Sequence, residues 1–330
     1  MINVLMDHQT FDMQQFGGIS RYFANIYHHL REDRNYNIQI SLLKTDNYYL
    51  KDDKFISNPL INYALKKHKR QLIYNRKFSI QKLKDNEFDI FHPTYYDPYF
   101  LNNLKKPFVL TVHDMIHELY PEFFQPFDIY VRYKRLTITK ADHIIAISES
   151  TKSDLQHFYN IPDEKISVIY HGLKTQNLQP VPIFNAINQP FILFIGDRFG
   201  YKNFYRFATA FKEISLRFKN IKLVCTGRPF DIVESEFLLR TGILDKTLLF
   251  SATDEELASL YQQALFYVSP SLLEGFGFPV LEAFENGCTT LLSDTGCFRE
   301  IAGDAAMYFD PLSIEDMVHA MQNLILNEGQ

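Results

Sequence analysis

Short apolar runs alternate with amphipathic helical patterns along almost the whole chain, and this alternation restricts the fold more than any other feature. In the first half, runs of strand length and strand composition lie at Ile2–Met6, Asn37–Leu43, Phe88–Phe91, Phe108–Val112, His143–Ile147 and Ile166–Tyr170. Strands that are separated by helices pair in parallel, with helices on both faces of the sheet. Residues 1–175 are therefore predicted to form an α/β domain.

The alternation stops and then starts again in the second half. Residues 176–189 carry Pro180 and Pro182 without sustained periodicity, which is typical of a linker. Strands are then predicted at Phe191–Ile195, Ile221–Cys225, Thr247–Phe250, Phe266–Ser269 and Thr289–Leu292. Helices are predicted at Tyr201–Arg217, Asp254–Gln263, Pro279–Asn286 and Ser313–Leu326. Residues 190–330 are therefore predicted to form a second domain of the same kind.

A chain of 330 residues, 46% of them hydrophobic, exceeds what one core usually supports, which agrees with two domains. The predicted fold class is α/β, with two Rossmann-like domains in series. Ligands of such sheets bind beyond the carboxyl ends of the strands, so two facing sheets would share one site in a central cleft. The chemistry is expected in the loops that follow strands.

Composition excludes several other classes. A net charge of −5 gives no general attraction to nucleic acid. Cys225, Cys288 and Cys297 are odd in number and widely spaced, so neither a disulfide framework nor a zinc site is indicated. The amino end lacks a secretion signal, and no apolar run approaches the roughly 20 residues that span a bilayer. A cytoplasmic protein is expected.

The most informative segment is Ser269–Asn286, which reads SPSLLEGFGFPVLEAFEN and follows a predicted strand. Pro279 suits the first turn of a helix, so Glu274 falls in the loop and Glu282 one turn inside the helix. Carboxylates pair well with vicinal hydroxyl groups, which sugars and ribose both present. The backbone between the glutamates would approach a ligand closely, through Gly275, Phe276, Gly277 and Phe278.

A basic pair follows the first strand of the second domain. The string FIGDRFGYKN ends a strand at Gly196 and places Arg198 and Lys202 in the loop before the next helix. The planar fork of arginine and the mobile charge of lysine together suit a diphosphate. A solvated helix start is the alternative interpretation.

Two loops of the first domain also carry candidate residues. Gly17 and Gly18 permit close backbone approach to a phosphate at a helix amino end. The loop lacks the G-x-G-x-x-G spacing of a dinucleotide fold, which disfavours an oxidoreductase. His113 ends a predicted strand beside Asp114, where its ring could bond a sugar hydroxyl or position an acceptor.

These strings together resemble the retaining glycosyltransferase family 4, and in particular its bacterial mannosyltransferase-like branch. The stretch HDMIHELYPEFF and the ADxIIAISEST string at Ala141–Thr151 extend the resemblance from Gly17 to Pro311. It implies the GT-B fold, in which two Rossmann-like domains face a central cleft.

The resemblance also implies roles for individual residues. Glu274 would lie near the donor sugar and Glu282 would bind the nucleotide ribose. Arg198, one residue displaced from the commonest arrangement, and Lys202 would bind the diphosphate, with the Gly17–Gly18 pair facing the phosphates. The expected catalytic set is His113, Arg198, Lys202 and Glu274.

No metal-binding cluster or cofactor motif is visible, so protein groups are expected to stabilise the leaving diphosphate. The branch favours GDP-mannose as donor, with a UDP-sugar as the alternative, and a glycan or lipid-linked oligosaccharide as acceptor. Three other interpretations stay open: a sugar-nucleotide epimerase or hydrolase, a phosphorylase, and a non-enzymatic twin-Rossmann sugar-binding protein.

Charge is unevenly distributed in the first domain. The stretch from Lys54 to Lys84 holds nine Lys or Arg residues and no Asp or Glu, with apolar residues between them. It is either a solvated helix face or a basic amphipathic surface for an anionic membrane.

Overall fold

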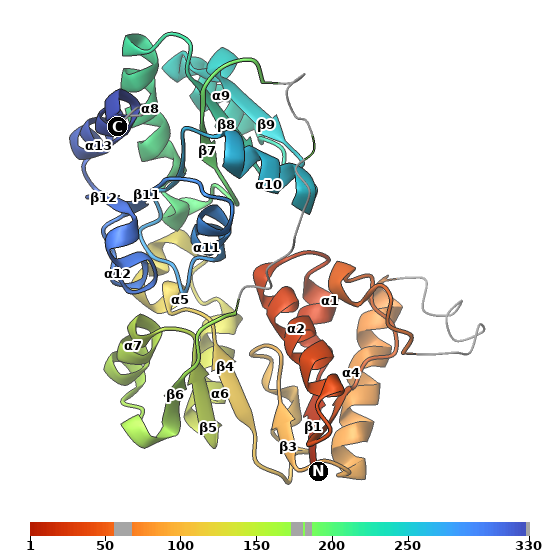
Figure 1. The fold of residues 1–330 in the computed structure, drawn as a ribbon. Coiled ribbons are helices and arrows are strands. Elements are labelled where there is room, and N and C mark those ends of the chain that lie inside the picture. Colours follow the sequence, from red (N-terminus) through yellow and green to blue (C-terminus); the bar gives the residue numbers. More distant parts are fainter. Residues whose placement is uncertain (56–67, 173–180, 182–186, 328–330) are drawn as a thin grey trace. The chain divides into compact units, whose positions relative to one another are not determined.

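The computed structural model describes residues 1–55, 68–172, 181 and 187–327. The chain divides into two compact units, Met1–His171 and Gly172–Gln330 (Figure 1). Most of the predicted linker 176–189, together with Lys66 and Lys67 of the basic stretch, lies outside the described residues. Ile187 is buried in the core of the second unit.

Unit 1 is a parallel sheet flanked by helices. Its strands are β1 (Ile2–Met6), β2 (Tyr36–Ile40), β3 (Ile90–His92), β4 (Val109–Val112), β5 (His143–Ala146) and β6 (Ile166–Val168). They pair as β2-β1-β3 and β4-β5-β6, and a parallel bridge between Phe91 and Phe108 joins the two groups. The helices are α1 (Gln9–Met13), α2 (Gly18–Glu32), α4 (His68–Asp85), α5 (Ile116–Leu119), α6 (Ile129–Lys140) and α7 (Glu149–Tyr159).

Two apolar clusters hold unit 1 together. One joins Phe23 of α2 to Met6 of β1, and both side chains are fully enclosed. The other packs Phe91, Phe100 and Leu110 beside the junction of the two strand groups. Fully burying an aromatic or aliphatic side chain contributes about 1.5–3 kcal/mol, so these clusters are a main stabilising term.

Unit 2 is a single six-stranded parallel sheet. Its strands are β7 (Phe191–Phe194), β8 (Lys222–Thr226), β9 (Thr247–Phe250), β10 (Phe266–Ser269), β11 (Thr290–Ser293) and β12 (Met307–Phe309). The spatial order is β12-β11-β10-β7-β8-β9, which is the doubly wound Rossmann order 3-2-1-4-5-6 read from the other edge. The first and fourth strands of the unit, β7 and β10, are therefore neighbours.

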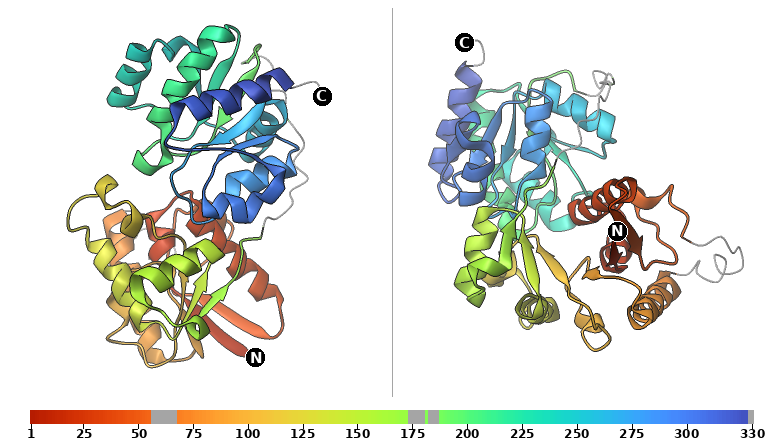
Figure 2. Two further views of the ribbon diagram at one scale, coloured as in Figure 1. Left: turned by 90° about the vertical axis from the view of Figure 1, so that its left-hand side faces the viewer. Right: turned by 60° about the horizontal axis from the view of Figure 1, so that its bottom comes forward.

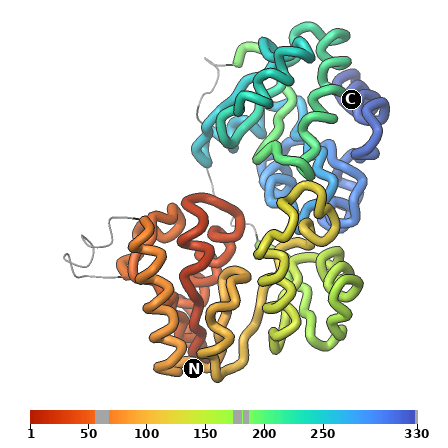
Figure 3. The backbone as a smooth tube through the Cα atoms, turned by 180° about the vertical axis from the view of Figure 1, so that it is seen from behind, coloured from red at the N-terminus to blue at the C-terminus, as the bar shows by residue number. Residues whose placement is uncertain are grey.

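The helices of unit 2 are α8 (Phe204–Arg217), α9 (Ile232–Thr241), α10 (Asp254–Gln263), α11 (Phe278–Glu285), α12 (Gly296–Ala302) and α13 (Ile314–Asn327). Helices α8 and α13, far apart in sequence, lie side by side (Figures 2 and 3). Buried residues of both, such as Phe211 and Met321, share one apolar cluster.

The predicted fold class is confirmed, with two Rossmann-like units. The helix predicted from Tyr201 begins only at Phe204, because Asn203 is left-handed with φ 58° and interrupts the helical backbone. The strand predicted to Leu43 ends at Ile40, because the Leu42 amide donates to the Ile40 carbonyl within the chain instead of to a neighbouring strand. The helices α9 and α12 and the three-residue strand β12 were not predicted.

Candidate functional site

The switch point of the unit 2 sheet gathers two of the predicted loops. The chain leaves β7 and β10 at the same edge of the sheet because these strands are parallel neighbours. The Leu272 amide donates to the Tyr201 carbonyl at 2.8 Å, which ties one loop to the other. The Asn203 side-chain amide donates to the carbonyls of Pro270 at 3.1 Å and Pro311 at 2.7 Å. The two loops are therefore fixed relative to each other.

Lys202 and Glu274 meet at this point. Lys202 Nζ donates to Glu274 Oε1 at 2.6 Å, and the Ser271 hydroxyl donates to the same oxygen at 2.6 Å. The Lys202 and Glu274 side chains are 21% and 16% exposed, so the pair is sheltered but reachable. Burial disfavours the ammonium charge, yet Glu274 and Tyr201 outweigh burial and raise the pKa of Lys202 above its ordinary value. Lys202 is a permanent cation here.

The glycine loop brings its backbone close to this pair. Gly277 precedes α11 with φ 101°, and a Cβ there would lie 3.1 Å from the ring of Phe298. Only glycine fits that position without strain. On the neighbouring strands, a Cβ on Gly227 would lie 2.9 Å from the Gly196 carbonyl oxygen, so the loops after β7 and β8 also touch through their backbones.

Glu282 lies in the second turn of α11, the helix that this loop opens. Pro279 stands in the first turn, as predicted. The Tyr261 hydroxyl lies 3.3 Å from Glu282 Oε2 and 2.9 Å from the Pro279 carbonyl, and this fixes the side of the helix that carries Glu282. The side chain is half-buried. Its predicted contact with a ribose stays a prediction.

Arg198 is placed differently from the sequence-based expectation. Its side chain is 0% exposed, and Nε donates to Glu234 Oε1 at 3.1 Å, with Glu234 itself 1% exposed. Its Nη2 donates to the carbonyls of Arg228 at 2.6 Å and Pro229 at 3.2 Å. These contacts make Arg198 a support for the loops after β7 and β8. Its Nη1 makes no hydrogen bond with a described residue, and the predicted contact with a phosphate stays a prediction.

In unit 1, His113 follows β4 inside an aromatic and histidine cluster. The ring makes edge contacts with Tyr22 and Phe23, and it stacks on His171 at a centroid distance of 6.1 Å. Its Nε2 makes no hydrogen bond with a residue that the structure describes. Burial, reinforced by His171, lowers the pKa of His113 to about 3. A neutral imidazole with that pKa is a weak base, and it suits a hydrogen bond to a hydroxyl group.

A buried ion network supports the loop after His113. Lys134 of α6 is 3% exposed and contacts Glu118 at 2.8 Å and Asp114 at 3.7 Å. The Tyr159 hydroxyl donates to Glu118 at 2.7 Å. Asp114 in turn accepts from the Ile116 amide at 3.1 Å, which starts α5. Although burial disfavours its charge, Lys134 holds the pKa of Asp114 below its ordinary value.

The Gly17–Gly18 pair begins α2. The Gln14 side-chain oxygen accepts from the Ser20 amide at 3.0 Å and so caps the helix from the preceding loop. A Cβ on Gly17 would lie 2.4 Å from that oxygen, so a larger residue there would displace the Gln14 side chain from this cap. Contact of this loop with donor phosphates stays a prediction.

Sequence reasoning missed Ser271, Asn203 and Lys134. Ser271 and Asn203 stand beside predicted site residues in the two post-strand loops, so position alone could have singled them out. Lys134 lies in a helix between other basic residues, and no local signal distinguishes it.

We expect the histidine cluster to make stability depend on pH. Burial lowers the pKa of His92 and His171 to about 4 and of His113 to about 3. Below pH 6.5 the unfolded chain therefore binds more protons, so folding stability falls with falling pH by up to about 1.4 kcal/mol per pH unit for each ring. The melting temperature of wild type should exceed that of His113→Gln by less at pH 5 than at pH 7, because the variant lacks the loss of stability that His113 causes at low pH.

His29→Gln serves as the control, since His29 is exposed on α2. Its gap to wild type should stay constant across the same pH range. A gap for His113→Gln that stays constant or widens as the pH falls would contradict the burial of a neutral His113.

Two features are absent from the described residues. None of them forms a group of three or more His, Cys, Asp or Glu side chains able to hold a metal ion. None of the helices built from them is long and apolar enough to cross a membrane.

Two family models match this chain. The model of Glycosyltransferase Family 4 matches residues 16–177, and that of Glycosyl transferases group 1 matches residues 181–330. Together they cover nearly the whole chain. The chain belongs to glycosyltransferase family 4. The expectation from the sequence is thereby confirmed.

Two relatives of this family-4 chain are named as O-antigen mannosyltransferases. The O-antigen chain mannosyltransferase RfbU of Salmonella typhimurium is 28% identical over 65% of this chain and 60% of its own length. The O-antigen chain mannosyltransferase B of Escherichia coli is 25% identical over 73% of this chain and 67% of its own length. The chain thus spans about 60% of the Salmonella relative.

Solved structures share the GT-B fold. Sucrose-phosphate synthase from Thermosynechococcus elongatus superposes with a TM-score of 0.74 at 15% identity, covering 99% of this chain and 90% of that one. Anabaena HepE, solved in complex with UDP and glucose, gives a TM-score of 0.70 at 15% identity, covering 99% and 90%.

Proposed function

We propose that this chain transfers a sugar, mannose in the first place, from a nucleoside diphosphate donor to a glycan or lipid-linked acceptor in surface polysaccharide synthesis. The observation that carries the proposal is the Lys202–Glu274 pair at the Rossmann switch point of unit 2, with Glu282 on the helix that follows. The names of the O-antigen mannosyltransferase relatives support mannose as the transferred sugar. The resemblance to their branch favours GDP-mannose as the donor.

The reaction breaks the bond between the sugar C1 and a phosphate oxygen and forms a bond from C1 to the acceptor oxygen. Negative charge grows on the departing diphosphate. Lys202 is a sheltered cation in the loop after β7, so it is suited to stabilise that charge. Both hydrogen bonds of Glu274 use Oε1, so Oε2 makes none with a described residue and is left for the donor sugar.

We propose retention of configuration, with attack on the face from which the diphosphate leaves. The acceptor proton then passes to the departing phosphate oxygen, so no protein base is needed. The low pKa of His113 supports this division of labour, because His113 would bind an acceptor or donor hydroxyl without taking its proton. The family resemblance supports it as well.

Metal independence is part of the same proposal. A fixed lysine and backbone amides supply the charge stabilisation for which other enzymes use a divalent ion. The lysine is already held in position, because Lys202 donates to Glu274, and Glu274 also accepts from the Ser271 hydroxyl.

A donor panel tests the proposal. GDP-mannose, GDP-fucose, UDP-glucose and UDP-galactose are incubated with the chain and a lipid-linked glycan acceptor, with and without EDTA. We expect GDP-mannose to give the highest transfer and EDTA to leave the rate unchanged. Higher turnover of a UDP-sugar would replace the donor, and complete loss in EDTA restored by Mg²⁺ would overturn the metal-free mechanism.

The basic stretch supports docking at an anionic membrane surface as a further part of the proposal. Helix α4 exposes Leu72, Ile73 and Tyr74. Exposed Lys69, Arg70 and Lys77 flank them. Each basic side chain near an anionic leaflet contributes roughly 1 kcal/mol, so such a helix is suited to reversible peripheral binding.

A further inference from the structure

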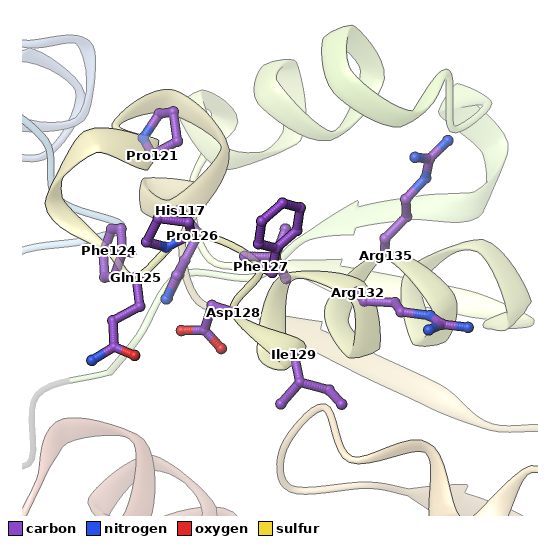
Figure 4. A pocket seen from close by; sticks show the side chains of 11 residues that line it. His117, Pro121, Phe124, Gln125, Pro126, Phe127, Asp128, Ile129, Arg132 and Arg135 are labelled. Carbon is purple, nitrogen blue, oxygen red and sulfur yellow. The ribbon is translucent and has the colours of Figure 1, made fainter.

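A hollow of about 570 Å³ lies between α5 and α6 of unit 1 (Figure 4). This volume falls within the range of about 300–1,000 Å³ that is typical of small-molecule sites. It belongs to neither the switch point of unit 2 nor the histidine cluster. Its walls combine apolar and cationic side chains, including Phe124, Pro126, Phe127, Ile129, Arg132 and Arg135.

Phe127 gives the hollow its most unusual feature. The side chain is 102% exposed, and its backbone is left-handed with φ 66°. A left-handed backbone costs a non-glycine residue roughly 1–2 kcal/mol, and a fully exposed ring returns no packing energy to the fold. Ile129 next to it is also exposed. The chain thus presents hydrocarbon at a position where folding alone gains nothing from it.

Two cations complement this apolar tip. Arg132 and Arg135 are exposed, lie one turn apart on α6, and form no ion pair with a described residue. Between them Lys134 turns inward and is paired. Asp128 also lines the hollow, but its carboxylate caps α6 by accepting from the Tyr130 amide at 2.9 Å. In the view of Figure 4, Phe127 lies between Phe124 and the two arginines.

We propose that this hollow binds the lipid phosphate end of a lipid-linked acceptor. The hydrocarbon would lie against Phe124, Phe127 and Ile129, and the phosphate would bridge Arg132 and Arg135. Guanidinium groups bind phosphate with planar, two-pronged hydrogen bonds. A neutral glycan would leave the two cations without an anion, and a free phosphate would leave the apolar tip without a partner, whereas an amphiphilic anion matches both halves. The inference rests on the proposed function and names the class of its acceptor.

Equilibrium binding of farnesyl phosphate, below its micelle concentration, tests the proposal. Farnesol lacks the anion and inorganic phosphate lacks the hydrocarbon, so each should bind at least tenfold more weakly than farnesyl phosphate. The double variant Arg132→Gln, Arg135→Gln should also lose at least tenfold. Arg240→Gln and Leu239→Ala, exposed on α9 of unit 2, should bind like wild type.

Phe127→Gly separates binding from folding. Glycine accepts the left-handed backbone without strain, so the variant should melt at the same temperature as wild type or higher. It should nevertheless bind farnesyl phosphate at least tenfold more weakly. Wild-type affinity in this variant or in the arginine variant would overturn the proposal.

Phosphatidylglycerol vesicles distinguish a bilayer from a single lipid. Vesicle retention that depends on Phe127, without any binding of monomeric farnesyl phosphate, would assign the hollow to the membrane surface and overturn the acceptor proposal. Because the readout is binding, a failure of GDP-mannose transfer would refute the proposed function and leave this result standing.

Discussion

Replacing Lys202 with alanine is expected to lower kcat/KM roughly 30- to 1,000-fold, which corresponds to about 2–4 kcal/mol of transition-state stabilisation. The reason is its position at the switch point, where it donates to Glu274, whose carboxylate also accepts from the Ser271 hydroxyl. Glu274 and Tyr201 raise the pKa of Lys202, so it stays a cation. The alanine variant removes the cation that would face the departing diphosphate. Steady-state kinetics with GDP-mannose measure the effect.

Lys219→Ala is the matched control, because Lys219 is an exposed lysine of the same unit. It should keep the wild-type rate. A Lys202→Ala enzyme within threefold of wild type would remove Lys202 from the mechanism.

The contact between Lys202 and Glu274 also predicts that their effects are coupled. Glu274→Gln weakens the ion pair and leaves Lys202 less fixed. Part of the decrease in kcat/KM caused by Glu274→Gln is therefore already included in the decrease caused by Lys202→Ala. The double variant should therefore lose less than the product of the two single losses. Multiplicative losses would show that the two side chains act independently.

The second large effect is on stability. Arg198→Met should lower the free energy of unfolding by about 3–5 kcal/mol, because it leaves the buried carboxylate of Glu234 without its enclosed partner. Arg228 still contacts Glu234 at 2.8 Å from a side chain that is 41% exposed, which places the expected loss at the lower end of that range. Thermal or chemical unfolding of the whole chain measures the change.

Arg299→Gln is the control for this prediction. Arg299 pairs with Asp294 at 2.7 Å, but both side chains are about half exposed. Such pairs contribute about 1 kcal/mol or less. An Arg198→Met protein that melts like wild type and yet binds GDP more weakly would instead support the direct phosphate contact predicted from the sequence.

Much of the fold was predictable because parallel strands are marked by continuous apolar runs. The pairing of Lys202 with Glu274 was also predictable, because both residues follow strands and a Rossmann order brings those strand ends together. The central cleft between the two units stays a prediction.

The environments of individual side chains were harder to predict. The burial of Arg198 depends on Glu234, which lies on α9, a helix that the sequence pattern did not reveal. The low pKa of His113 depends on enclosure by Tyr22, Phe23 and His171, which come from distant parts of unit 1. Local pattern gives the position of a residue along the chain, whereas these properties arise from its neighbours in space.

Calorimetric titration of GDP in the presence of EDTA tests most directly whether the switch point of unit 2 is a metal-independent donor site. Wild type and Lys219→Ala should each bind one GDP per chain with the same affinity, and Lys202→Ala should bind at least tenfold more weakly. Equal affinity of wild type and Lys202→Ala, or binding of GDP only when a divalent ion is supplied, would contradict the account.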